Sequence, residues 1–160
     1  MDIRIRKARR SDLEPVVALI PRLRSFGDQW LRPSDSLDRA ESDAIAHAIT
    51  SLPEGAAVFV AESPSVQGGV AGFAYAESSV DYFTREKHGH LAIIAVHGDA
   101  EGSGVGRKLL QAVEEWAMTR GYRFVTLNVF AQNERARRVY ERAGYSQDTI
   151  RYAKEIRSVD

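Results

Sequence analysis

The sequence predicts a single α+β domain with a mixed β-sheet, and two patterns of strands and helices lead to this fold class. Apolar segments 56–61 and 70–78 are separated by a turn rich in Ser, Pro and Gly, which is typical of an antiparallel hairpin. Segments 90–96, 105–120 and 124–130 are predicted as strand, helix and strand. Such a βαβ unit makes its two strands parallel and its crossover right-handed. We therefore expect a central mixed sheet of six or seven strands flanked by four helices.

Composition limits the class of protein. The 160 residues fit one domain, residues 1–160, with 44% apolar and 28% charged side chains. Lys+Arg and Asp+Glu both total 22, so no net field would attract nucleic acid or an anionic membrane surface. The chain has no long apolar run for a membrane span, and its N-terminus lacks the apolar stretch of a signal peptide. We therefore expect a cytoplasmic protein that binds neither nucleic acid nor membrane.

The absence of cysteine excludes several kinds of chemistry. No disulfide, thiolate metal site or acyl transfer through a cysteine thioester can form. The four histidines show no spacing typical of a metal-ligand pair, so we expect no metal.

The N-terminal third predicts one strand and two helices. Residues 3–8 alternate Ile and Arg, as a half-exposed strand does. The capping box at 11–14 predicts a helix that starts at Asp12, and Pro21 should bend or end it. A second helix is predicted over 37–52. Its apolar positions at helical spacing should face inward: Leu37, Ala40, Ala44, Ile45, Ala48 and Ile49.

The remaining elements follow from length and periodicity. Helix 105–120 carries an apolar stripe, and Gly121 caps its end. A short helix is predicted over 134–142, ending at Gly144. Residues 149–156 can form a last strand, and if exposed it would support a homodimer. The stripe of helix 105–120 consists of Leu109, Leu110, Val113, Trp116 and Ala117.

A glycine-rich segment, Glu101 to Lys108, connects strand 90–96 to the following helix. Alternating glycines let the backbone approach a ligand closely, and the unpaired N–H groups at a helix start form an anion site. A Walker loop would need Ser or Thr after Gly-Lys, and a dinucleotide fingerprint would need G-x-G-x-x-G early in the chain. The acetyl-CoA loop, [Gln/Arg]-x-x-Gly-x-[Gly/Ala], fits at Gly104 and Gly106 and departs at Glu101. An ordinary glycine-rich helix start is the alternative interpretation of this segment taken alone.

A second motif follows the next strand. The pattern N-x-x-A-x-x-x-Y-x-x-x-G-[Phe/Tyr] is present at Asn133, Ala136, Tyr140, Gly144 and Tyr145. With the order strand, glycine loop, helix and strand before it, the chain resembles the GNAT (Gcn5-related) N-acetyltransferase family. The resemblance covers Leu91 to Tyr145, about a third of the chain.

The resemblance implies binding of acetyl-CoA. The end of the strand before the loop would pair its backbone with pantetheine, the loop amides would take the pyrophosphate, and Asn133 would hold the cofactor arm. The cofactor-binding residues expected on this basis are Ile94, Ala95, Val96, Glu101, Gly102, Ser103, Gly104, Val105, Gly106, Arg107, Lys108, Asn133, Ala136 and Tyr140.

The resemblance also implies direct acetyl transfer to an amine, with Tyr140 as the general acid. Asn133 and Tyr140 lie seven residues apart, so both point along one helix face. Family members often carry a glutamate base on the strand before the loop, and strand 90–96 has no carboxylate. His90 is one candidate for the general base, because the ordinary pKa of histidine lies close to neutral pH. Other candidates are Glu77, Asp81, Glu86 and solvent.

The acceptor is expected to be a small-molecule primary amine. Aromatic and acidic residues in the connections over the cleft would bind it, and Asn128 would position it. A protein lysine or N-terminal acetyltransferase, or a non-catalytic acyl-CoA sensor, would fit the same motifs. The expected substrate residues are Phe26, Trp30, Asp81, Tyr82, Phe83 and Asn128.

Overall fold

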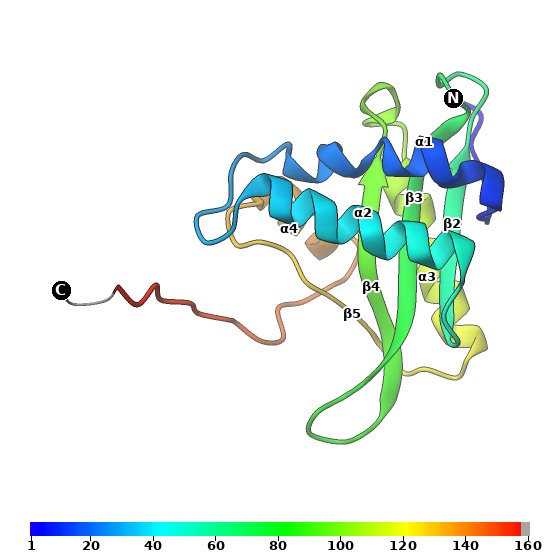
Figure 1. Cartoon of the computed structure of the whole chain (residues 1–160). Coiled ribbons are helices and arrows are strands. Elements are labelled where there is room, and N and C mark those ends of the chain that lie inside the picture. Colours follow the sequence, from blue (N-terminus) through cyan, green and yellow to red (C-terminus); the bar gives the residue numbers. More distant parts are fainter. Residues whose placement is uncertain (158–160) are drawn as a thin grey trace.

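A five-stranded mixed sheet forms the centre of the structure, a computed structural model that describes residues 1–157 (Figure 1). The strands lie in chain order. The first three pairings are antiparallel, and β4 and β5 are parallel. The strands are β1 (Arg4–Lys7), β2 (Ala56–Glu62), β3 (Val70–Val80), β4 (Lys87–Val96) and β5 (Val125–Leu127). The predicted α+β class with a mixed sheet is confirmed.

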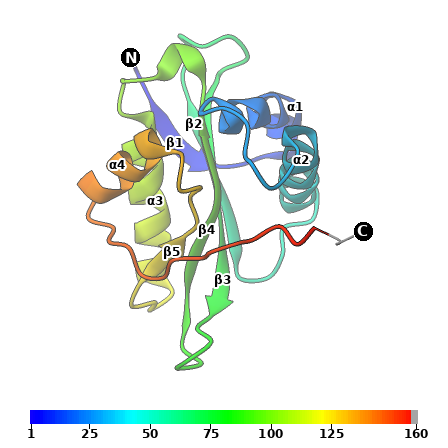
Figure 2. The same ribbon diagram turned by 90° about the vertical axis from the view of Figure 1, so that its left-hand side faces the viewer.

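Four α-helices cover the two faces of this sheet, as predicted. The pair α1 and α2 lies on one face and the pair α3 and α4 on the other (Figure 2). Short 3₁₀ turns precede α1, follow it, and precede the glycine-rich loop. The helices are α1 (Leu13–Val17), α2 (Ser34–Thr50), α3 (Val105–Thr119) and α4 (Glu134–Arg142).

The first helix differs from its prediction. The Ser11 capping box does not form, because Ser11 lies within a 3₁₀ turn, Arg10–Asp12, whose start is capped by the Asp12 carboxylate, and α1 begins only at Leu13. The Asp12 carboxylate accepts the backbone N–H of Arg9 at 2.6 Å and two hydrogen bonds from the Arg6 guanidinium at 2.7 and 2.9 Å. Pro21 falls within a 3₁₀ turn, so the regular helix ends before it as predicted.

The predicted number of strands, six or seven, was wrong: the sheet has five, and the predicted last strand is not part of it. Residues 149–156 run extended and exposed outside the sheet, and β5 covers only part of the predicted 124–130. Among the described residues, 149–156 pair with no strand and β5 pairs with β4 on one side only. A strand is held by backbone pairing that its own sequence cannot supply. On α2, Ala40 and Ala44 are exposed because the buried face is narrower than predicted and centres on Ile45 and Ala48.

Each face of the sheet has its own core. Phe73 from β3 packs with the α1 and α2 side, whereas Leu109 and Val113 of α3 pack on the opposite face. Gly72 allows α3 to approach closely. A Cβ there would stand 2.8 Å from the carbonyl oxygen of Ala95 and 2.9 Å from Cγ1 of Val105. Close packing at Gly72 thus fixes the start of α3 against β3 and β4.

The Arg6–Asp12 ion pair ties β1 to the start of α1, and we expect it to contribute measurably to stability. The side chains are 13% and 6% exposed. The hydrogen bonds from Arg6 hold the pKa of Asp12 below its ordinary value of 3.8. Asp12→Ala should lower the free energy of unfolding by about 2 kcal/mol in urea titrations at neutral pH, because it removes two charged hydrogen bonds and leaves the buried Arg6 guanidinium with the partly exposed Glu62, at 3.3 Å, as its carboxylate partner.

The double variant Arg6→Met/Asp12→Ala should lose less than the sum of the two single variants. The contribution should be fully present above pH 3.8 and disappear as the pH falls through the lowered pKa. Additive single losses would show that the pair is not coupled.

Candidate active site

The centre of the candidate site is a gap between β4 and β5. β5 pairs with β4 only at Gly89, His90 and Leu91. The register of β4 against β3 then skips Ala92, since Tyr75 faces Ile93 and Ala76 faces Leu91. Beyond this bulge, the backbone of 93–96 has β3 on one side and no strand on the other within residues 1–157. The predicted residues Ile94, Ala95 and Val96 therefore present an open strand edge.

The glycine-rich loop follows directly on that edge. Gly102 and Gly104 have φ of 75° and 86°, a left-handed conformation that a Cβ disfavours, and Gly104 is the N-cap of α3. The first helical hydrogen bond is donated by the N–H of Lys108 to the carbonyl of Gly104. In the described chain, the N–H groups of Gly102 and 104–107 have no acceptor. Together with the helix dipole they form a site for an anion.

The charged side chains of the loop point to different places. Lys108 directs its ammonium to the carbonyl of Ile3 at 3.4 Å, whereas Arg107 is exposed. Glu101 accepts hydrogen bonds from Arg22, which follows α1, and from Arg135 of α4, the latter at 3.2 Å. Glu101 thus links the segments on both sides of the loop. The side chain of Ser103 turns inward and donates to the carbonyl of Ala100.

The second sequence motif, which begins at Asn133, forms α4 and its N-terminal cap. Asn133 is its N-cap, and its side-chain oxygen accepts the N–H of Ala136 at 3.2 Å. This bond fixes the asparagine amide, whose NH₂ group has no partner in residues 1–157. Two turns later, Tyr140 packs against the same apolar cluster as Ile94 and Val96 of β4. Tyr140 therefore lies on the same face of the sheet as the side chains of Ile94 and Val96.

The phenol of Tyr140 is suited to keep its proton. Burial alone raises its pKa above the ordinary value of 10.0. Its ring lies 6.1 Å from that of Tyr145 in a tilted arrangement. The hydroxyl makes no hydrogen bond within the described chain, and it is not among the fully buried polar atoms. It is a protonated donor that an incoming group can reach.

A polar cluster lies on the other face of the sheet, at the point where β5 leaves β4. Glu77 of β3 faces His90 directly across the strands, and Thr126 of β5 faces His90 from the other side. The hydroxyl oxygen of Thr126 is 2.8 Å from Nδ1 of His90 and 3.1 Å from Nε2 of His88. Sequence reasoning named His90 but missed Thr126, because cross-strand register brings it there.

The geometry of this cluster restricts its protons. The Thr126 hydroxyl has one hydrogen and can donate it to only one of the two rings, so the other ring must donate to Thr126. When His90 donates through Nδ1, its Nε2 carries a free lone pair. Burial lowers the pKa of His90 below its ordinary value of 6.5, and Glu77 opposes this effect. His90 is therefore mainly neutral at pH 7 and can accept a proton.

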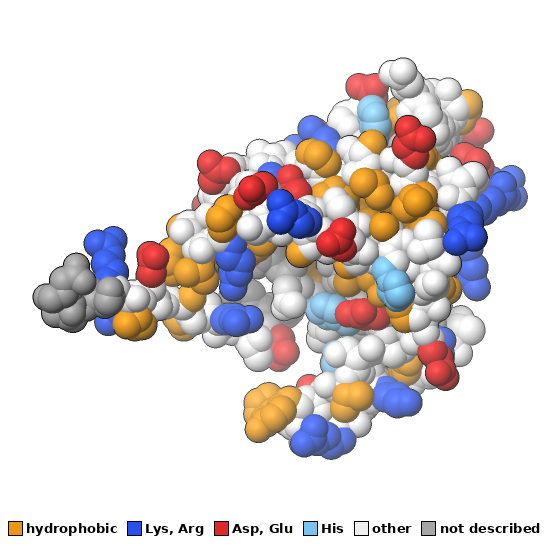
Figure 3. Space-filling model, viewed as in Figure 1, with side chains coloured by type: hydrophobic (Ala, Val, Ile, Leu, Met, Phe, Trp, Pro, Cys, Tyr) orange, Lys and Arg blue, Asp and Glu red, His pale blue; other side chains and the backbone are white. Residues whose placement is uncertain are grey.

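A hollow opens on this face between the C-terminal segment and the β3–β4 loop. Figure 3 shows histidine and acidic side chains side by side along it, beneath the helices of this face. The hollow has no apolar lid among the residues visible in that view.

The loop before α2 closes one side of the site. The rings of Phe26 and Phe130 are 5.8 Å apart, and Gln132 donates to the carbonyl of Asp28 at 2.7 Å. This loop thus packs on the segment that leads into α4. Trp30 is 61% exposed, beside a shallow cavity of about 390 Å³ formed by residues 28–34.

The other expected substrate residues do not join this loop. Asp81, Tyr82 and Phe83 lie in the β3–β4 loop, at the end of the hairpin remote from the loop before α2 (Figure 1). The Asp81 carboxylate caps the turn by accepting the N–H groups of Phe83 and Thr84. Tyr82 and Phe83 are 76% and 82% exposed. Asn128 is exposed just after β5, on the side of the gap.

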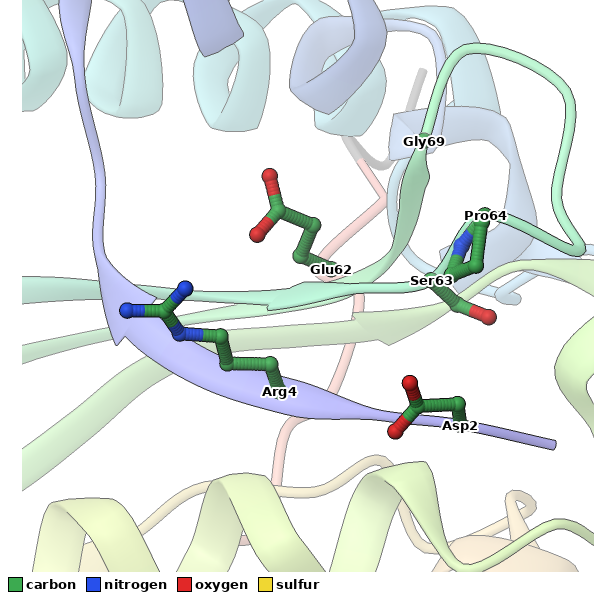
Figure 4. A pocket seen from close by; sticks show the side chains of 6 residues that line it. All are labelled: Asp2, Arg4, Glu62, Ser63, Pro64 and Gly69. Carbon is green, nitrogen blue, oxygen red and sulfur yellow. The ribbon is translucent and has the colours of Figure 1, made fainter.

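A cavity of about 330 Å³ lies elsewhere, at the β1 edge of the sheet (Figure 4). Asp2, Arg4 and Glu62 line it, with Ser63, Pro64 and Gly69. This edge is separated from the β4–β5 gap by β2 and β3, so the cavity has no part in the chemistry of the site. Within residues 1–157, no three His, Asp or Glu side chains group closely enough to hold a metal ion.

Comparison with known proteins gives the site a context. The model of the acetyltransferase (GNAT) family matches residues 22–145. A 56-residue segment is 45% identical to the 5-NmdU N-acetyltransferase of Pseudomonas phage PaMx11, and covers 35% of this chain and 38% of that protein. The matches thus span little more than a third of the length of the curated relatives.

Solved structures share the whole fold. A putative acetyl transferase from Pyrococcus furiosus has a TM-score of 0.76 at 22% identity, covering 97% of this chain and 100% of that one. The structure of AAC(6')-Iy in complex with a bisubstrate analog, CoA-S-monomethyl-acetylneamine, has a TM-score of 0.69 at 23% identity, covering 98% and 100%. At these identities the likeness concerns the fold.

Two glycine variants should separate backbone strain from ligand contact in the loop. Gly104→Ala should lower the free energy of unfolding by about 1 kcal/mol, because alanine disfavours the left-handed φ of 86°. Gly106 does not have a left-handed φ, and a Cβ added there would meet only Cγ2 of Val96, at 3.8 Å. Gly106→Ala therefore introduces no backbone strain. Its stability should stay within about 0.5 kcal/mol of the parent chain.

Both variants should reduce the rise in melting temperature that acetyl-CoA produces by mass action. Gly106→Ala is the decisive case, since its fold is intact. An unchanged ligand-induced shift in that variant would place the anion elsewhere.

Proposed function

Because the chain belongs to the acetyltransferase (GNAT) family, we propose that it is an enzyme that moves acetyl from acetyl-CoA directly to a primary amine of a small molecule. One observation carries the proposal: the open β4 edge leads into a glycine loop with free amides, and Tyr140 packs with the apolar cluster to which Ile94 and Val96 of that edge belong. An open edge, an anion site and a proton donor are what a nucleotide-linked thioester requires.

The residues around the gap fit acetyl-CoA. The edge formed by Ile94, Ala95 and Val96 offers strand-like hydrogen bonds to the amides of pantetheine. The free N–H groups between Gly102 and Arg107 suit the pyrophosphate. The NH₂ group of Asn133, whose amide is fixed by its capping bond, would donate to the arm between them. When bound, acetyl-CoA supplies an activated acetyl group.

Tyr140 is the proposed general acid. The new bond joins the amine nitrogen to the acetyl carbon, the carbon–sulfur bond breaks, and the departing sulfur needs a proton. The Tyr140 hydroxyl donates it, and its raised pKa ensures that the phenol is protonated at neutral pH. A free backbone N–H of Ile94 or Val96 would stabilise the negative charge on the carbonyl oxygen during attack.

His90 is the proposed proton acceptor for the amine. An ammonium must lose a proton before it can attack, and Nε2 of His90 has no partner within residues 1–157 and is not fully buried. Thr126 holds the ring through Nδ1. Glu77, directly opposite, stabilises the imidazolium that forms. Acid and base then sit on opposite faces of one gap.

The acceptor is proposed to enter from the hollow beside His90. Glu77 offers a carboxylate for an ammonium, and Phe26 and Trp30 offer aromatic surface on the loop before α2. Similar folds include AAC(6')-Iy, solved with a bisubstrate analog of CoA and acetylneamine, and glucosamine-6-phosphate N-acetyltransferase from Arabidopsis thaliana. These names support a small acceptor here. The remaining predicted acceptor contacts are those of the β3–β4 loop and of the residue after β5: Asp81, Tyr82, Phe83 and Asn128.

A single domain over 1–160, a cytoplasmic location and a homodimer remain predictions. None of the helices in the described part of the chain has the length and apolar character needed to cross a bilayer.

A panel of amines tests the function, with Tyr140→Phe as the matched variant. We expect release of free CoA with one or more small primary amines, and with peptides much more slowly. Tyr140→Phe should lower kcat about 10²-fold or more, because it removes only the donated proton, and leave the Kd for acetyl-CoA nearly unchanged. Faster release with peptides would favour a protein acetyltransferase. Binding without release for any acceptor would favour the sensor.

The pH dependence tests His90. In the parent chain, kcat/KM should fall on the acid side as His90 is protonated, at a pH below its ordinary pKa of 6.5 because burial lowers that pKa. His90→Gln should lose this limb and about 10²-fold in rate at neutral pH. His47→Gln, on the exposed face of α2, is the control and should keep both. A His90→Gln profile identical to the parent would remove His90 from the mechanism.

A further inference from the structure

His88 is a buried histidine that the proposed mechanism leaves without a role. It is 6% exposed, and its ring stacks on the ring of Phe124 with the centroids 4.6 Å apart. Its Nε2 lies 3.1 Å from the hydroxyl oxygen of Thr126. Its Nδ1 is fully buried and has no hydrogen-bond partner within residues 1–157. A buried polar atom without a partner is uncommon in a folded protein and calls for an explanation.

Thr126 connects His88 to the proposed base, His90. Its hydroxyl oxygen lies 3.1 Å from Nε2 of His88 and 2.8 Å from Nδ1 of His90, and it has no other side-chain partner in the described chain. The hydroxyl donates to one ring and accepts from the other. When both rings are neutral, two arrangements satisfy both contacts. Either both rings carry their proton on Nε2, or both carry it on Nδ1.

The partnerless Nδ1 of His88 decides between these two arrangements. If both protons lie on Nδ1, this atom is a buried N–H group without an acceptor among the described residues. If both lie on Nε2, it is a buried lone pair, and orphaned acceptors are more common in proteins than orphaned N–H donors. We therefore expect both protons on Nε2 in the free chain.

We propose that His88 is a positioning residue that determines, through Thr126, when His90 can accept a proton. This role rests on the proposed function, in which Nε2 of His90 takes the proton of the acceptor amine. That atom has a free lone pair only in the arrangement with both protons on Nδ1. Because this arrangement buries an N–H group of His88, only a fraction of the molecules is ready to act as a base at any moment.

A proton added to the cluster changes all three side chains and leaves its charge on His90. Nδ1 of His88 binds the added proton, and the proton on Nε2 of His88 passes to the oxygen of Thr126. The original hydroxyl proton of Thr126 passes to Nδ1 of His90. His88 and Thr126 each gain one proton and lose one, so the result is an imidazolium at His90 and a neutral His88 with its proton moved to Nδ1.

The charged groups around the pair are consistent with this final state. Glu77 of β3 faces His90 directly and attracts the imidazolium. Asp81 and Glu86 of the β3–β4 loop carry charges that interact with His88. Their carboxylates are engaged elsewhere, however, Asp81 in capping its own turn and Glu86 in an ion pair of 2.9 Å. His88 is also the more buried of the two rings, so the charge is more stable on His90.

NMR of the chain with isotope-labelled histidine rings tests this role without any turnover, because the nitrogen resonances show which atom carries the proton. At alkaline pH both His88 and His90 should carry it on Nε2. As the pH falls and His90 becomes charged, His88 should move its proton to Nδ1 with the same midpoint. The midpoint should lie below 6.5, since burial lowers the pKa of His90. His47, exposed on α2, is the internal reference and should show no change from one neutral tautomer to the other.

Thr126→Val and Thr126→Ser are the matched variants. Valine keeps the branched shape of threonine and removes the hydroxyl, so His88 should keep one tautomer throughout the titration of His90. Serine retains the hydroxyl, and the coupled switch should remain. A His88 ring that keeps one tautomer in the parent chain, or that still switches in Thr126→Val, overturns the proposal. If Thr126→Val does not fold, the parent chain alone decides.

Turnover separates this proposal from the proposed function. With an amine that the parent chain acetylates, Thr126→Val should lower kcat about tenfold, because His90 loses the oxygen that holds its Nδ1–H, and leave the Kd for acetyl-CoA nearly unchanged. An unchanged kcat would overturn the positioning role. A coupled switch in a chain that acetylates no amine would overturn the proposed function, while the coupling of the two rings would stand.

Discussion

The divergence of β5 from β4 after Leu91 is the constraint on which the rest of the site depends. Parallel pairing covers three residues, and the bulge at Ala92 turns the remainder of β4 away from further pairing. Backbone groups at such an edge must find partners outside the sheet. A ligand with amides at strand-like spacing gains those hydrogen bonds without competing against a protein strand. Tyr140 and His90 lie on opposite faces of the sheet, Tyr140 with the cluster that includes Ile94 and Val96 and His90 beside Thr126 of β5.

The packing of α3 fixes the loop relative to this gap. Gly72 lets Val105 sit against β3, and Leu109 is fully buried one turn later. The position of the helix start is thereby set by the core and not by the flexible loop, so the free amides of 104–107 are preorganised. Folding has already fixed these N–H donors in place, so a ligand that binds them does not have to order the loop, and binding is stronger for that reason.

Much of the fold followed from local signals. The bounds of α4 and the start of α3 agree with the sequence because Asn133 and Gly104 act as caps within their own segments. The site elements that the sequence did not predict arise between segments far apart in the chain. The bulge at Ala92 appears only in the register with β3, and Thr126 reaches His90 only through pairing with β4. The Ser11 capping box was misinterpreted because the Asp12 carboxylate caps a 3₁₀ turn that contains Ser11, and its ion pair with Arg6 on β1 holds it there.

Glu101 shows how one departure from a motif can be compatible with the chemistry of the site. Its carboxylate stands where the acetyl-CoA loop usually has Gln or Arg, and a lone negative charge there would repel phosphate. Arg22 and Arg135 both donate to it, so the trio carries a net positive charge at the mouth of the loop. The guanidinium of Arg135 is largely exposed and has donors left for a second anion. A carboxylate that gathers two arginines from separate elements thus preserves the sign of the field that the backbone amides create, while tying α4 to the segment after α1.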